Sequence, residues 1–563
     1  MTSETSEPDR LETYRLHEQD WEDYDALYDA FEWEVPERFN IATYVCDRWA
    51  GTGRTALIAE DAEGTNEYTF GDLRSKANRF ANYLREQGVE RGDRVGVNGT
   101  QRVEVLVTHL ACWKLGAISV PLSVLFGPDA LRYRLDDSGT EACVVTEGGI
   151  EAFRAVKDEL TTIETEVVIN TEPEGEETSY STAVEDQPDD CETVETDPEE
   201  TATVIYTSGT TGDPKGVVLP HQHLLGILPS IICSTYNLEV REDDVSRTPV
   251  EWSWVGSLND GVLPALYYGF PVVAADLGPF DPETELELLE RHDVTVMGGP
   301  PTAYRVVFNH PAVEEYDLSS VRGIGLGGEA AGDSLIERSR EVVPEAAVHE
   351  VYGQSEAPIF VGDCEALGVP HRSGKMGKPA PGHEVRIVDP DTQEHVEAGE
   401  AGEIAIRREG NPICFTEYWN DPEKTEQKIH DGWQLCEDLG SIDEDGYLKF
   451  HGRKDDIILS SGYKVGPAEV EDALAGHDAV VNAGVIGVPD DTRGELVKAF
   501  VELAEGNEPS EELKTELQGF VKDRLAKYEY PRELSFTDEL PKTTTGKIRR
   551  RDLREREGLV ESG

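Results

Sequence analysis

The feature that most constrains the fold is a short apolar strand followed at once by a loop of glycines and hydroxyl residues. Residues 203–206 read Thr-Val-Ile-Tyr, a β-branched and aromatic run typical of a buried strand. The loop over residues 207–216 leaves backbone N–H groups and hydroxyls free to face one ligand, and Lys215 adds a cation, which suits the phosphates of a nucleotide. The Walker A pattern does not fit, because Pro214 replaces its second glycine and Gly216 replaces its serine or threonine. The loop alone leaves two readings open, a phosphate-binding loop of another class or a polar turn.

Strands and helices alternate along the first part of the chain. Apolar runs predict strands at residues 94–97, 117–122 and 143–146, and apolar residues at helical spacing predict helices over 103–115 and 131–136. This alternation is typical of an α/β fold. The 563 residues exceed one ordinary hydrophobic core, so we expect a multi-domain protein.

The charge balance is strongly acidic. Asp and Glu number 114 against 51 Lys and Arg, which gives a net charge of −63. Such a surface repels nucleic acid and anionic lipid, so we expect neither as a partner. Excess acid with little lysine suits a cell interior rich in salt, because salt screens the self-repulsion of the surface. The sequence therefore predicts a halophilic protein.

Nothing in the sequence predicts export or a membrane anchor. The first fifteen residues are acidic and polar, unlike a signal peptide, and no apolar run is long enough to span a bilayer. The eight cysteines show no CxxC pairing, so we interpret them as reduced, mostly structural thiols. We therefore expect a cytoplasmic location. The oligomeric state is left open, a homo-oligomer included.

Further motifs follow the loop in order. The glycines of residues 327–330 come directly after a predicted strand, where they let a flat ring lie against the backbone. Residues 350–356 read Glu-Val-Tyr-Gly-Gln-Ser-Glu and end on a carboxylate of the kind that holds Mg²⁺ beside phosphates. Charged clusters then stand at 431–440, 452–456 and 541–550. Taken singly, these motifs are also compatible with a strand-end turn, exposed acids, a solvated linker and a basic tail.

Together and in this order, the motifs resemble those of the adenylate-forming superfamily, which includes acyl-CoA synthetases, luciferases and peptide-synthetase adenylation domains. The resemblance runs from residue 39 to residue 553. It implies a large N-terminal domain, residues 1–452, built of α/β subdomains with a β-barrel-like piece, and a small mobile α+β domain, residues 453–563. In this family the small domain turns about the residue matched by Asp455, so we expect the hinge there.

The resemblance also implies a site for ATP and AMP. Tyr352 is expected to cover the adenine, and the Ser355 hydroxyl, where the family usually has threonine, to meet the α-phosphate. Glu356 is expected to hold Mg²⁺. Asp438 is expected to bind the ribose hydroxyls, although the two residues before it depart from the family's Thr-Gly. The residues matched to nucleotide binding are Thr207, Ser208, Gly209, Thr210, Thr211, Gly212, Lys215, Gly328, Glu329, Ala330, Glu350, Tyr352, Gly353, Gln354, Ser355, Asp438 and Arg453.

Lys547, in the run Pro-Lys-Thr-Thr-Thr-Gly-Lys, matches the family's lysine that reaches the substrate carboxylate and the α-phosphate. We expect it to stabilise the charge that builds on phosphorus, with Glu356 and Ser355 as the other catalytic residues. One departure affects coenzyme A, because Glu529 stands where the family has a lysine near the coenzyme A phosphates. The residues matched to coenzyme A binding are Ser461, Gly462, Tyr463 and Arg493.

The activity that the resemblance implies is ATP-dependent ligation of a carboxylic acid to coenzyme A through an acyl-adenylate, with release of AMP and pyrophosphate. The motifs are most similar to those of short- and medium-chain acyl-CoA synthetases, so the acid is expected to be a fatty acid of that length or similar. Trp252 and Trp254 are expected to close a short acyl pocket, or else are core aromatics. The alternative is a free-standing enzyme that loads a carrier protein. A non-catalytic adenylate binder is disfavoured because Lys547, Asp438 and Glu356 are all present.

Overall fold

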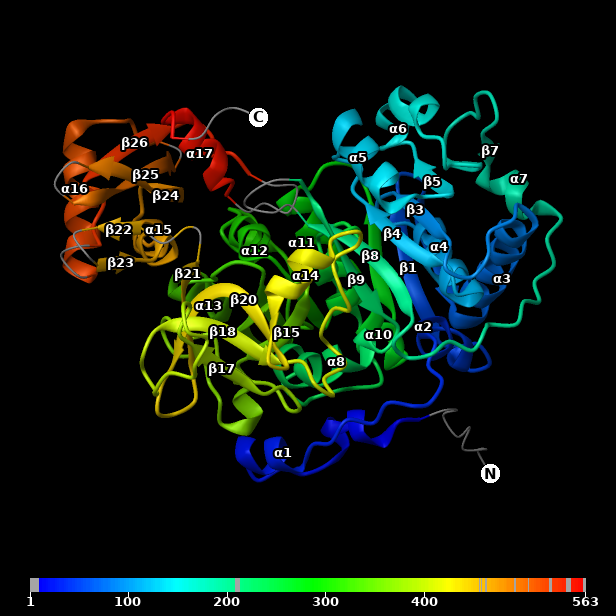
Figure 1. Ribbon diagram of the computed structural model, residues 1–563, viewed down its shortest axis with the longest axis horizontal. Coiled ribbons are helices and arrows are strands. Elements are labelled where there is room, and N and C mark those ends of the chain that lie inside the picture. Colours follow the sequence, from blue (N-terminus) through cyan, green and yellow to red (C-terminus); the bar gives the residue numbers. More distant parts are fainter. Residues whose placement is uncertain are drawn as a thin grey trace.

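The computed structural model describes residues 10–207, 213–454, 456, 458–460, 463–490, 493–504, 506–525, 529–542 and 548–559. A large domain is followed by a small C-terminal one, drawn orange to red at one end of the molecule in Figure 1. Both domains mix helices and strands, so the predicted multi-domain α/β fold is confirmed.

The first sheet of the large domain has seven strands and carries the strand that leads into the phosphate loop. Its neighbours run parallel, except that the last two are antiparallel. In spatial order the strands are β7 (Thr178–Ser179), β6 (Thr165–Ile169), β5 (Ala142–Thr146), β3 (Arg94–Asn98), β4 (Ile118–Leu122), β8 (Thr201–Thr207) and β9 (Lys215–Pro220). Strands β4 and β5 are buried at every position, as expected where helices cover both faces of a parallel sheet.

Helices pack around this sheet close to where the sequence predicts them. Helix α4 spans Val103–Leu115, the predicted range, and ends on Gly116 in the left-handed conformation. Helix α3 (Phe70–Glu86) begins with a capping box in which Thr69 and Asp72 satisfy each other's backbone N–H groups. The other helices are α2 (Ile41–Val45), α5 (Pro128–Ser138), α6 (Ile150–Val156) and α7 (Tyr180–Glu185).

The second sheet of the large domain has nine strands, of which the central ones run parallel. In spatial order they are β16 (Lys378–Pro379), β15 (Ala357–Gly362), β14 (Ala347–Gln354), β13 (Gly323–Gly327), β12 (Val296–Gly299), β10 (Ser246–Arg247), β11 (Val272–Asp276), β1 (Thr55–Asp61) and β2 (Gly64–Thr69). Its helices are α8 (His223–Ser230), α10 (Leu263–Tyr267), α11 (Pro282–Arg291), α12 (Pro301–Phe308) and α13 (Asp333–Val342).

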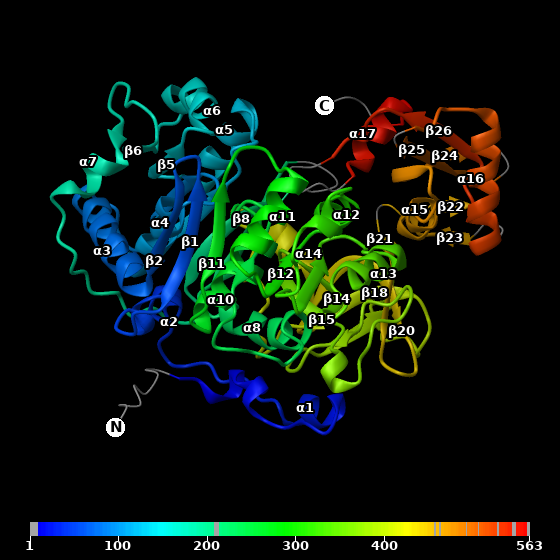
Figure 2. The same ribbon diagram turned by 180° about the vertical axis from the view of Figure 1, so that it is seen from behind.

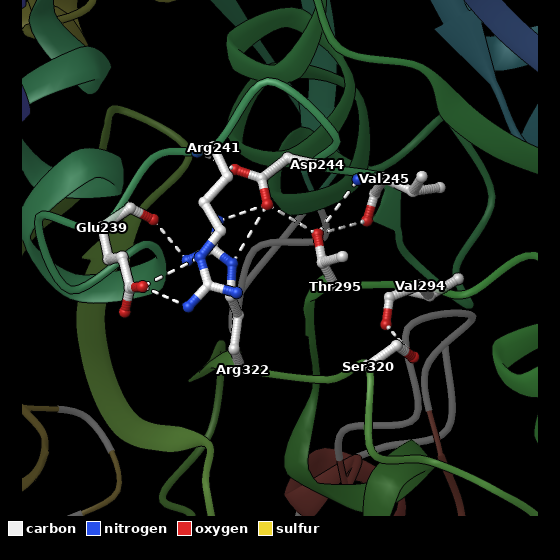
Figure 3. A network of polar contacts seen from close by, with 8 residues as sticks. All are labelled: Glu239, Arg241, Asp244, Val245, Val294, Thr295, Ser320 and Arg322. Atoms are coloured by element: carbon white, nitrogen blue, oxygen red, sulfur yellow. Dashed lines mark hydrogen bonds and ion pairs between the residues drawn. The ribbon is translucent and has the colours of Figure 1, made fainter.

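A buried polar network fixes the starts of β10, β12 and β13 (Figure 3). Asp244 accepts hydrogen bonds from the Thr295 hydroxyl at 2.9 Å and from Arg322 Nε at 3.1 Å. Arg322 also donates to the carbonyl oxygen of Glu239, and the Val245 N–H donates to Thr295 at 3.0 Å. A buried charge that loses its partner is strongly destabilising, so Asp244 and Arg322 hold each other at this edge of the sheet. The opposite edge, at the carboxyl ends of the strands, is where ligands bind in open α/β sheets.

A third, antiparallel sheet completes the large domain. Its strands are β17 (Val385–Val388), β18 (Gly402–Arg407), β20 (Trp433–Ile442), β19 (Ile429–His430) and β21 (Leu448–Arg453), the last paired with β20. Helix α14 (Pro422–Lys428) leads into β19. The pairing of β20 with β21 puts Asp438 directly opposite Arg453, so two motifs that lie apart in the sequence meet here.

The small domain is a five-stranded sheet packed against helices. Its strands are β23 (Tyr463–Val465), β22 (Ile458–Ser460), β25 (Gly494–Leu503), β24 (Val480–Asp490) and β26 (Glu533–Thr537), and its helices are α15 (Pro467–Ala475), α16 (Glu511–Arg524) and α17 (Arg550–Arg556). Apolar residues from α15, α16, β24 and β25 form its own core. Figure 2 shows α15 and α17 on the side that faces the large domain.

The N-terminal arm lies along the base of the large domain, with α1 (Tyr24–Ala30) at the lower edge in Figure 1. The Tyr24 hydroxyl donates to the Pro379 carbonyl at 2.8 Å and the Tyr28 hydroxyl donates to the His383 carbonyl at 2.9 Å. The aromatic residues of the arm are therefore anchors. Within the described ranges, none of the helices combines the length and the apolar character that a membrane crossing needs.

Candidate active site

A cavity of about 2320 Å³ lies between the two domains. Its walls come from the carboxyl ends of β8 and β14, from β20, and from α15 and α17 of the small domain. Most of the predicted site residues that the structure describes meet in this cavity. Those that line it are Thr207, Lys215, Trp254, Gly328, Glu329, Ala330, Tyr352, Gly353, Gln354, Ser355, Glu356, Asp438 and Arg453.

Several predicted residues lie outside the described part of the chain. They are Ser208, Gly209, Thr210, Thr211, Gly212, Asp455, Ser461, Gly462 and Lys547. The flanks of two of these segments are described. Thr207 and Lys215 face each other across β8 and β9, so the phosphate loop starts and ends at one point of the cavity wall. Lys542 and Ile548, on either side of the segment with Lys547, form a β-bridge and line the cavity.

Three residues whose side chains the structure describes do not line the cavity, namely Trp252, Glu350 and Arg493. Trp252 is fully buried, and its indole N–H has no hydrogen-bond partner among the described residues. Glu350 is buried and accepts a hydrogen bond from the Ala331 N–H at 3.0 Å, and burial raises the pKa of its carboxyl to about 7. Arg493 lies beside Asp490 in the small domain, with Nη1 3.4 Å from Oδ1. Tyr463 opens β23, paired with Ser460.

One corner of the cavity joins an aromatic ring, a carboxylate and a guanidinium. The Tyr352 hydroxyl donates to Asp438 Oδ2 at 2.7 Å, and Arg453 Nε lies 3.1 Å from Asp438 Oδ1. The Tyr352 ring packs against Phe360 and Phe450, which fixes its plane. Burial, together with the Asp438 charge, raises the pKa of the Tyr352 hydroxyl, so it stays a donor. The corner presents a flat apolar face beside an anion, which suits a nucleoside.

Glu356 occupies the neighbouring wall and is held from two directions. The Tyr418 hydroxyl donates to Glu356 Oε1, and Gln434 Nε2 donates to the Glu356 carbonyl oxygen at 3.0 Å. Burial and the Glu356 charge raise the pKa of Tyr418. The ammonium of Lys215 lies 5.0 Å from the centre of the Tyr418 ring. A fixed carboxylate and a lysine therefore stand together beside the phosphate loop.

Glu437 adds a second acid to this wall. Its backbone is in the left-handed region, with φ of 57°, which costs free energy for any residue but glycine. Its Oε2 lies 3.2 Å from Nζ of Lys428, whose side chain is 2% exposed. Burial alone would lower the pKa of Lys428, but Glu356 and Glu437 raise it above its usual value. The buried lysine therefore stays charged between two carboxylates.

The loop after β13 is held by its own side chains. Glu329 Oε1 accepts a hydrogen bond from the Thr302 N–H at 2.8 Å, in the first turn of α12. Gly328 has φ of +92°, so glycine is required there. The backbone of this loop, more than the Glu329 carboxylate, is thus available to a ligand.

Sequence reasoning missed Tyr418 and Lys428. Tyr418 meets Glu356 from 62 positions further along the chain, and no local motif marks it. The signal for Lys428 was the departure at Glu437, because an acid in place of glycine needs a compensating partner. A buried ion pair of Arg247 with Glu285, at 2.8 Å, also lines the cavity and was not predicted.

Comparison with protein-family models gives two matches. The AMP-binding enzyme model matches residues 46–419, and the AMP-binding enzyme C-terminal domain model matches residues 469–547. The first alone covers more than half of the chain. Both halves of the resemblance are therefore supported.

Characterised and uncharacterised relatives span almost the whole chain. Acetyl-coenzyme A synthetase of Bacillus subtilis is 34% identical over 549 residues, covering 94% of this chain and 94% of its own. The uncharacterized acyl-CoA ligase YtcI of the same organism is 34% identical over 529 residues, covering 93% and 97%. Human mitochondrial acyl-coenzyme A synthetase ACSM4 is 33% identical over 537 residues, covering 93% and 91%.

Solved structures of acyl-CoA ligases also match the chain over almost its whole length. The anthranilate CoA ligase AuaEII in complex with anthranoyl-AMP matches with a TM-score of 0.85 and 28% identity, covering 93% of this chain and 98% of its own. The Brucella canis acyl-CoA synthetase matches with a TM-score of 0.73 and 32% identity, covering 96% and 99%. The chain therefore belongs to the AMP-binding enzyme family and, within it, to the acyl-CoA synthetases, AMP-forming ligases that join a carboxylic acid to coenzyme A.

Proposed function

We propose that both half-reactions of this ligase use the cavity between the domains. In the first half an oxygen of the substrate carboxylate bonds to the α-phosphorus of ATP, and the bond to pyrophosphate breaks. Tyr352 and Asp438 hold the nucleoside, and the loop between Thr207 and Lys215 holds the phosphates. The observation that carries the proposal is the junction of Tyr352, Asp438 and Arg453 in the same cavity as Glu356.

Charge stabilisation in the first half falls to Lys547 and Ser355. The cation offsets negative charge on the five-coordinate phosphorus, and the hydroxyl donates to an α-phosphate oxygen. The described flanks of Lys547 line the cavity, which supports this role. Arg549, Arg550 and Arg551 also line it, and each is paired with a carboxylate of the small domain.

The residues present fit a magnesium ion. Glu356 lines the cavity, and within the described part of the chain its Oε2 makes no hydrogen bond, so one carboxylate oxygen is available. Mg²⁺ takes one or two protein carboxylates together with phosphate oxygens. When bound, the ion would neutralise charge on the phosphates. Glu356 would hold it, and Tyr418 keeps the carboxylate oriented.

In the second half the coenzyme A sulfur bonds to the acyl carbon, its proton leaves, and the bond to AMP breaks. Pyrophosphate and the thiol need different surroundings, so we propose that the small domain, residues 453–563, turns about Asp455 relative to residues 1–452. Residues matched to coenzyme A binding in the small domain are Ser461, Gly462, Tyr463 and Arg493.

The acid is proposed to be short or of medium length. Trp254 lines the cavity, whereas Trp252 lies in the core. Acetyl-coenzyme A synthetase among the relatives agrees with a small acid. We further propose a cytoplasmic enzyme adapted to high salt, on the strength of the net charge of −63.

The direct test is pyrophosphate release with ATP and Mg²⁺ across acids from acetate to long-chain and aromatic ones, in molar KCl, with and without coenzyme A. We expect release with at least one acid, and AMP and acyl-CoA to accumulate when coenzyme A is the sole acceptor. Release that needs a carrier protein instead would favour the carrier-loading alternative. No release with any acid would refute the proposal.

A further inference from the structure

Gln101 is a buried glutamine that joins the two parallel sheets of the large domain. It follows β3 of the seven-stranded sheet, whereas its hydrogen-bond partners belong to the nine-stranded sheet and to the loop that leaves it. Its side chain is 5% exposed and lines the cavity. The half-reactions proposed for this cavity do not use it.

Every hydrogen-bonding position of the Gln101 amide has a partner. Its Nε2 donates to the carbonyl oxygens of Thr248 at 2.9 Å and Val250 at 2.5 Å. Its Oε1 accepts from Arg247 Nη1 at 2.5 Å and from the Ala275 N–H at 3.2 Å. Because the nitrogen meets two acceptors and the oxygen meets two donors, a single orientation of the amide satisfies all four partners.

Arg247, the charged partner of Gln101, is itself fixed. Its Nη2 lies 2.8 Å from Glu285 Oε2, and its Nε lies 3.2 Å from Glu285 Oε1. Its Nη1 also donates to the carbonyl oxygen of Val273 at 3.1 Å. Both charged side chains are buried, and a bidentate pair of this kind has a specific geometry. The oxygen of Gln101 is therefore held by a rigid support that joins β11 to α11.

The nitrogen of Gln101 holds a loop that forms one wall of the cavity. Residues 248–254 lie between β10 and the short helix α9 (Val255–Ser257) and belong to neither a strand nor a helix. The residues of this loop that line the cavity are Pro249, Val250, Glu251, Ser253 and Trp254. The Ser257 hydroxyl also donates to the Val250 carbonyl oxygen, at 2.7 Å. Side-chain donors therefore fix the backbone of this wall.

This wall lies to one side of the proposed nucleotide site. Strand β12 separates β10 from β13 in the sheet, so the loop after β10 lies about 10 Å from the loop after β13. The residues proposed to face the nucleotide come from the ends of β13 and β14 and from β20 and β21. The described hydrogen bonds of Gln101 include none of them. A change at Gln101 should therefore reach the acid before it reaches ATP.

We propose that Gln101 is a positioning residue for the acid. It fixes the backbone of residues 248–250 and thereby sets the room that Val250 and Trp254 leave for the acyl chain. A loop that lost both hydrogen bonds from Gln101 would leave two carbonyl oxygens without these donors and would hold the acid less well in its reactive position. The inference rests on the proposed function and adds a residue that determines its acid specificity.

The test separates the two sides of the amide. Gln101→Glu keeps an oxygen for Arg247 and Ala275 but turns a second oxygen toward the loop carbonyls. Gln101→Met keeps the length of the side chain and makes none of the four hydrogen bonds. Gln87→Glu, at an exposed glutamine of the same domain, is the matched control for the added charge. Pyrophosphate release is measured over saturated acids of increasing length, with KM for acid and for ATP determined separately and the thermal midpoint recorded.

We expect both Gln101 variants to raise KM for the preferred acid about tenfold and to reduce the preference between acids two carbons apart, while KM for ATP stays within about twofold. Gln87→Glu should match wild type. Ser257→Ala removes the other side-chain donor to the Val250 carbonyl and should shift the length profile in the same direction by a smaller factor, so it carries the test if the Gln101 variants do not fold.

Two results would overturn this inference and leave the proposed function standing. One is a lowered thermal midpoint with an unchanged KM for the acid and an unchanged length profile, which would make the role of Gln101 structural. The other is a parallel rise of KM for acid and for ATP. No pyrophosphate release by wild type with any acid would instead refute the proposed function.

Discussion

At the scale of single residues, Glu437 has two opposing effects on stability. Its backbone conformation is strained, and its side chain forms an ion pair with Lys428. Glu437→Gly relieves the left-handed backbone, worth about 1 kcal/mol, but takes away one of the two carboxylates beside the buried Lys428, which costs about 3 kcal/mol. We expect a net loss of about 2 kcal/mol in the free energy of unfolding, measured by urea denaturation. The double variant Glu437→Gly/Lys428→Ala should regain stability. Equal stabilities of the single and double variants would show that the pair is not coupled.

Substitutions of Trp252 and Trp254 should have different effects, the first on stability and the second on substrate specificity. Trp252→Ala removes a fully buried side chain and should cost about 3–5 kcal/mol in the free energy of unfolding. Trp254→Gly opens the cavity wall and should raise kcat/KM for acids longer by several carbons about tenfold, with little loss of stability. The readouts are urea denaturation and pyrophosphate release over a series of chain lengths. An unchanged length profile for Trp254→Gly would remove it from the acyl pocket.

Sequence patterns predicted those site residues that belong to a short local motif. Tyr352 and Asp438 each sit in a recognisable motif, and the structure brings them within hydrogen-bonding distance. Tyr418 and Lys428 were beyond prediction, because their roles depend on which groups the fold places around them. A buried acid and an exposed acid read alike in a sequence, above all in one with 114 acidic residues.

At the scale of elements, helix α15 of the small domain places an acidic residue, Asp472, against the large domain. Asp472 of α15 lies against Gly332, whose added Cβ would be 3.4 Å from its Oδ1. Although Asp472 keeps accessible surface in the cavity, desolvation between the domains, together with the Glu350 charge, raises the pKa of its carboxyl to about 8. Since the docked state binds this proton more tightly than a solvated aspartate does, docking should weaken as pH rises from about 4 to about 8.

This pH effect can be measured without turnover. Energy transfer between dyes on the two domains should show less docking of the ligand-free protein at pH 8.5 than at pH 5.5, and Asp472→Asn should flatten the profile. An unchanged pH profile in Asp472→Asn would show that another titrating group causes the effect.

Strand positions such as β4 and β5 were predictable from continuous apolar runs in the sequence. The acids that face the other domain were not predictable, because their surroundings depend on how the two domains meet.

At the scale of the whole molecule, the net charge makes stability depend on salt. A net charge of −63 makes the compact state repel itself, and salt screens that repulsion. We expect the thermal midpoint to rise by about 10 °C or more between dilute buffer and molar KCl, followed by circular dichroism at pH 7. Sucrose at matched osmolality serves as the uncharged control. Equal midpoints in both buffers would contradict halophilic adaptation.

The central claim is that one cavity serves two half-reactions that different faces of the small domain support. Lys547→Ala tests it most directly, with acyl-adenylate formation from acid and ATP measured beside acyl-CoA formation from supplied acyl-adenylate and coenzyme A. We predict that the first rate falls by about 10²–10³ while the second stays within about twofold of wild type. Equal loss of both rates would contradict the division of labour.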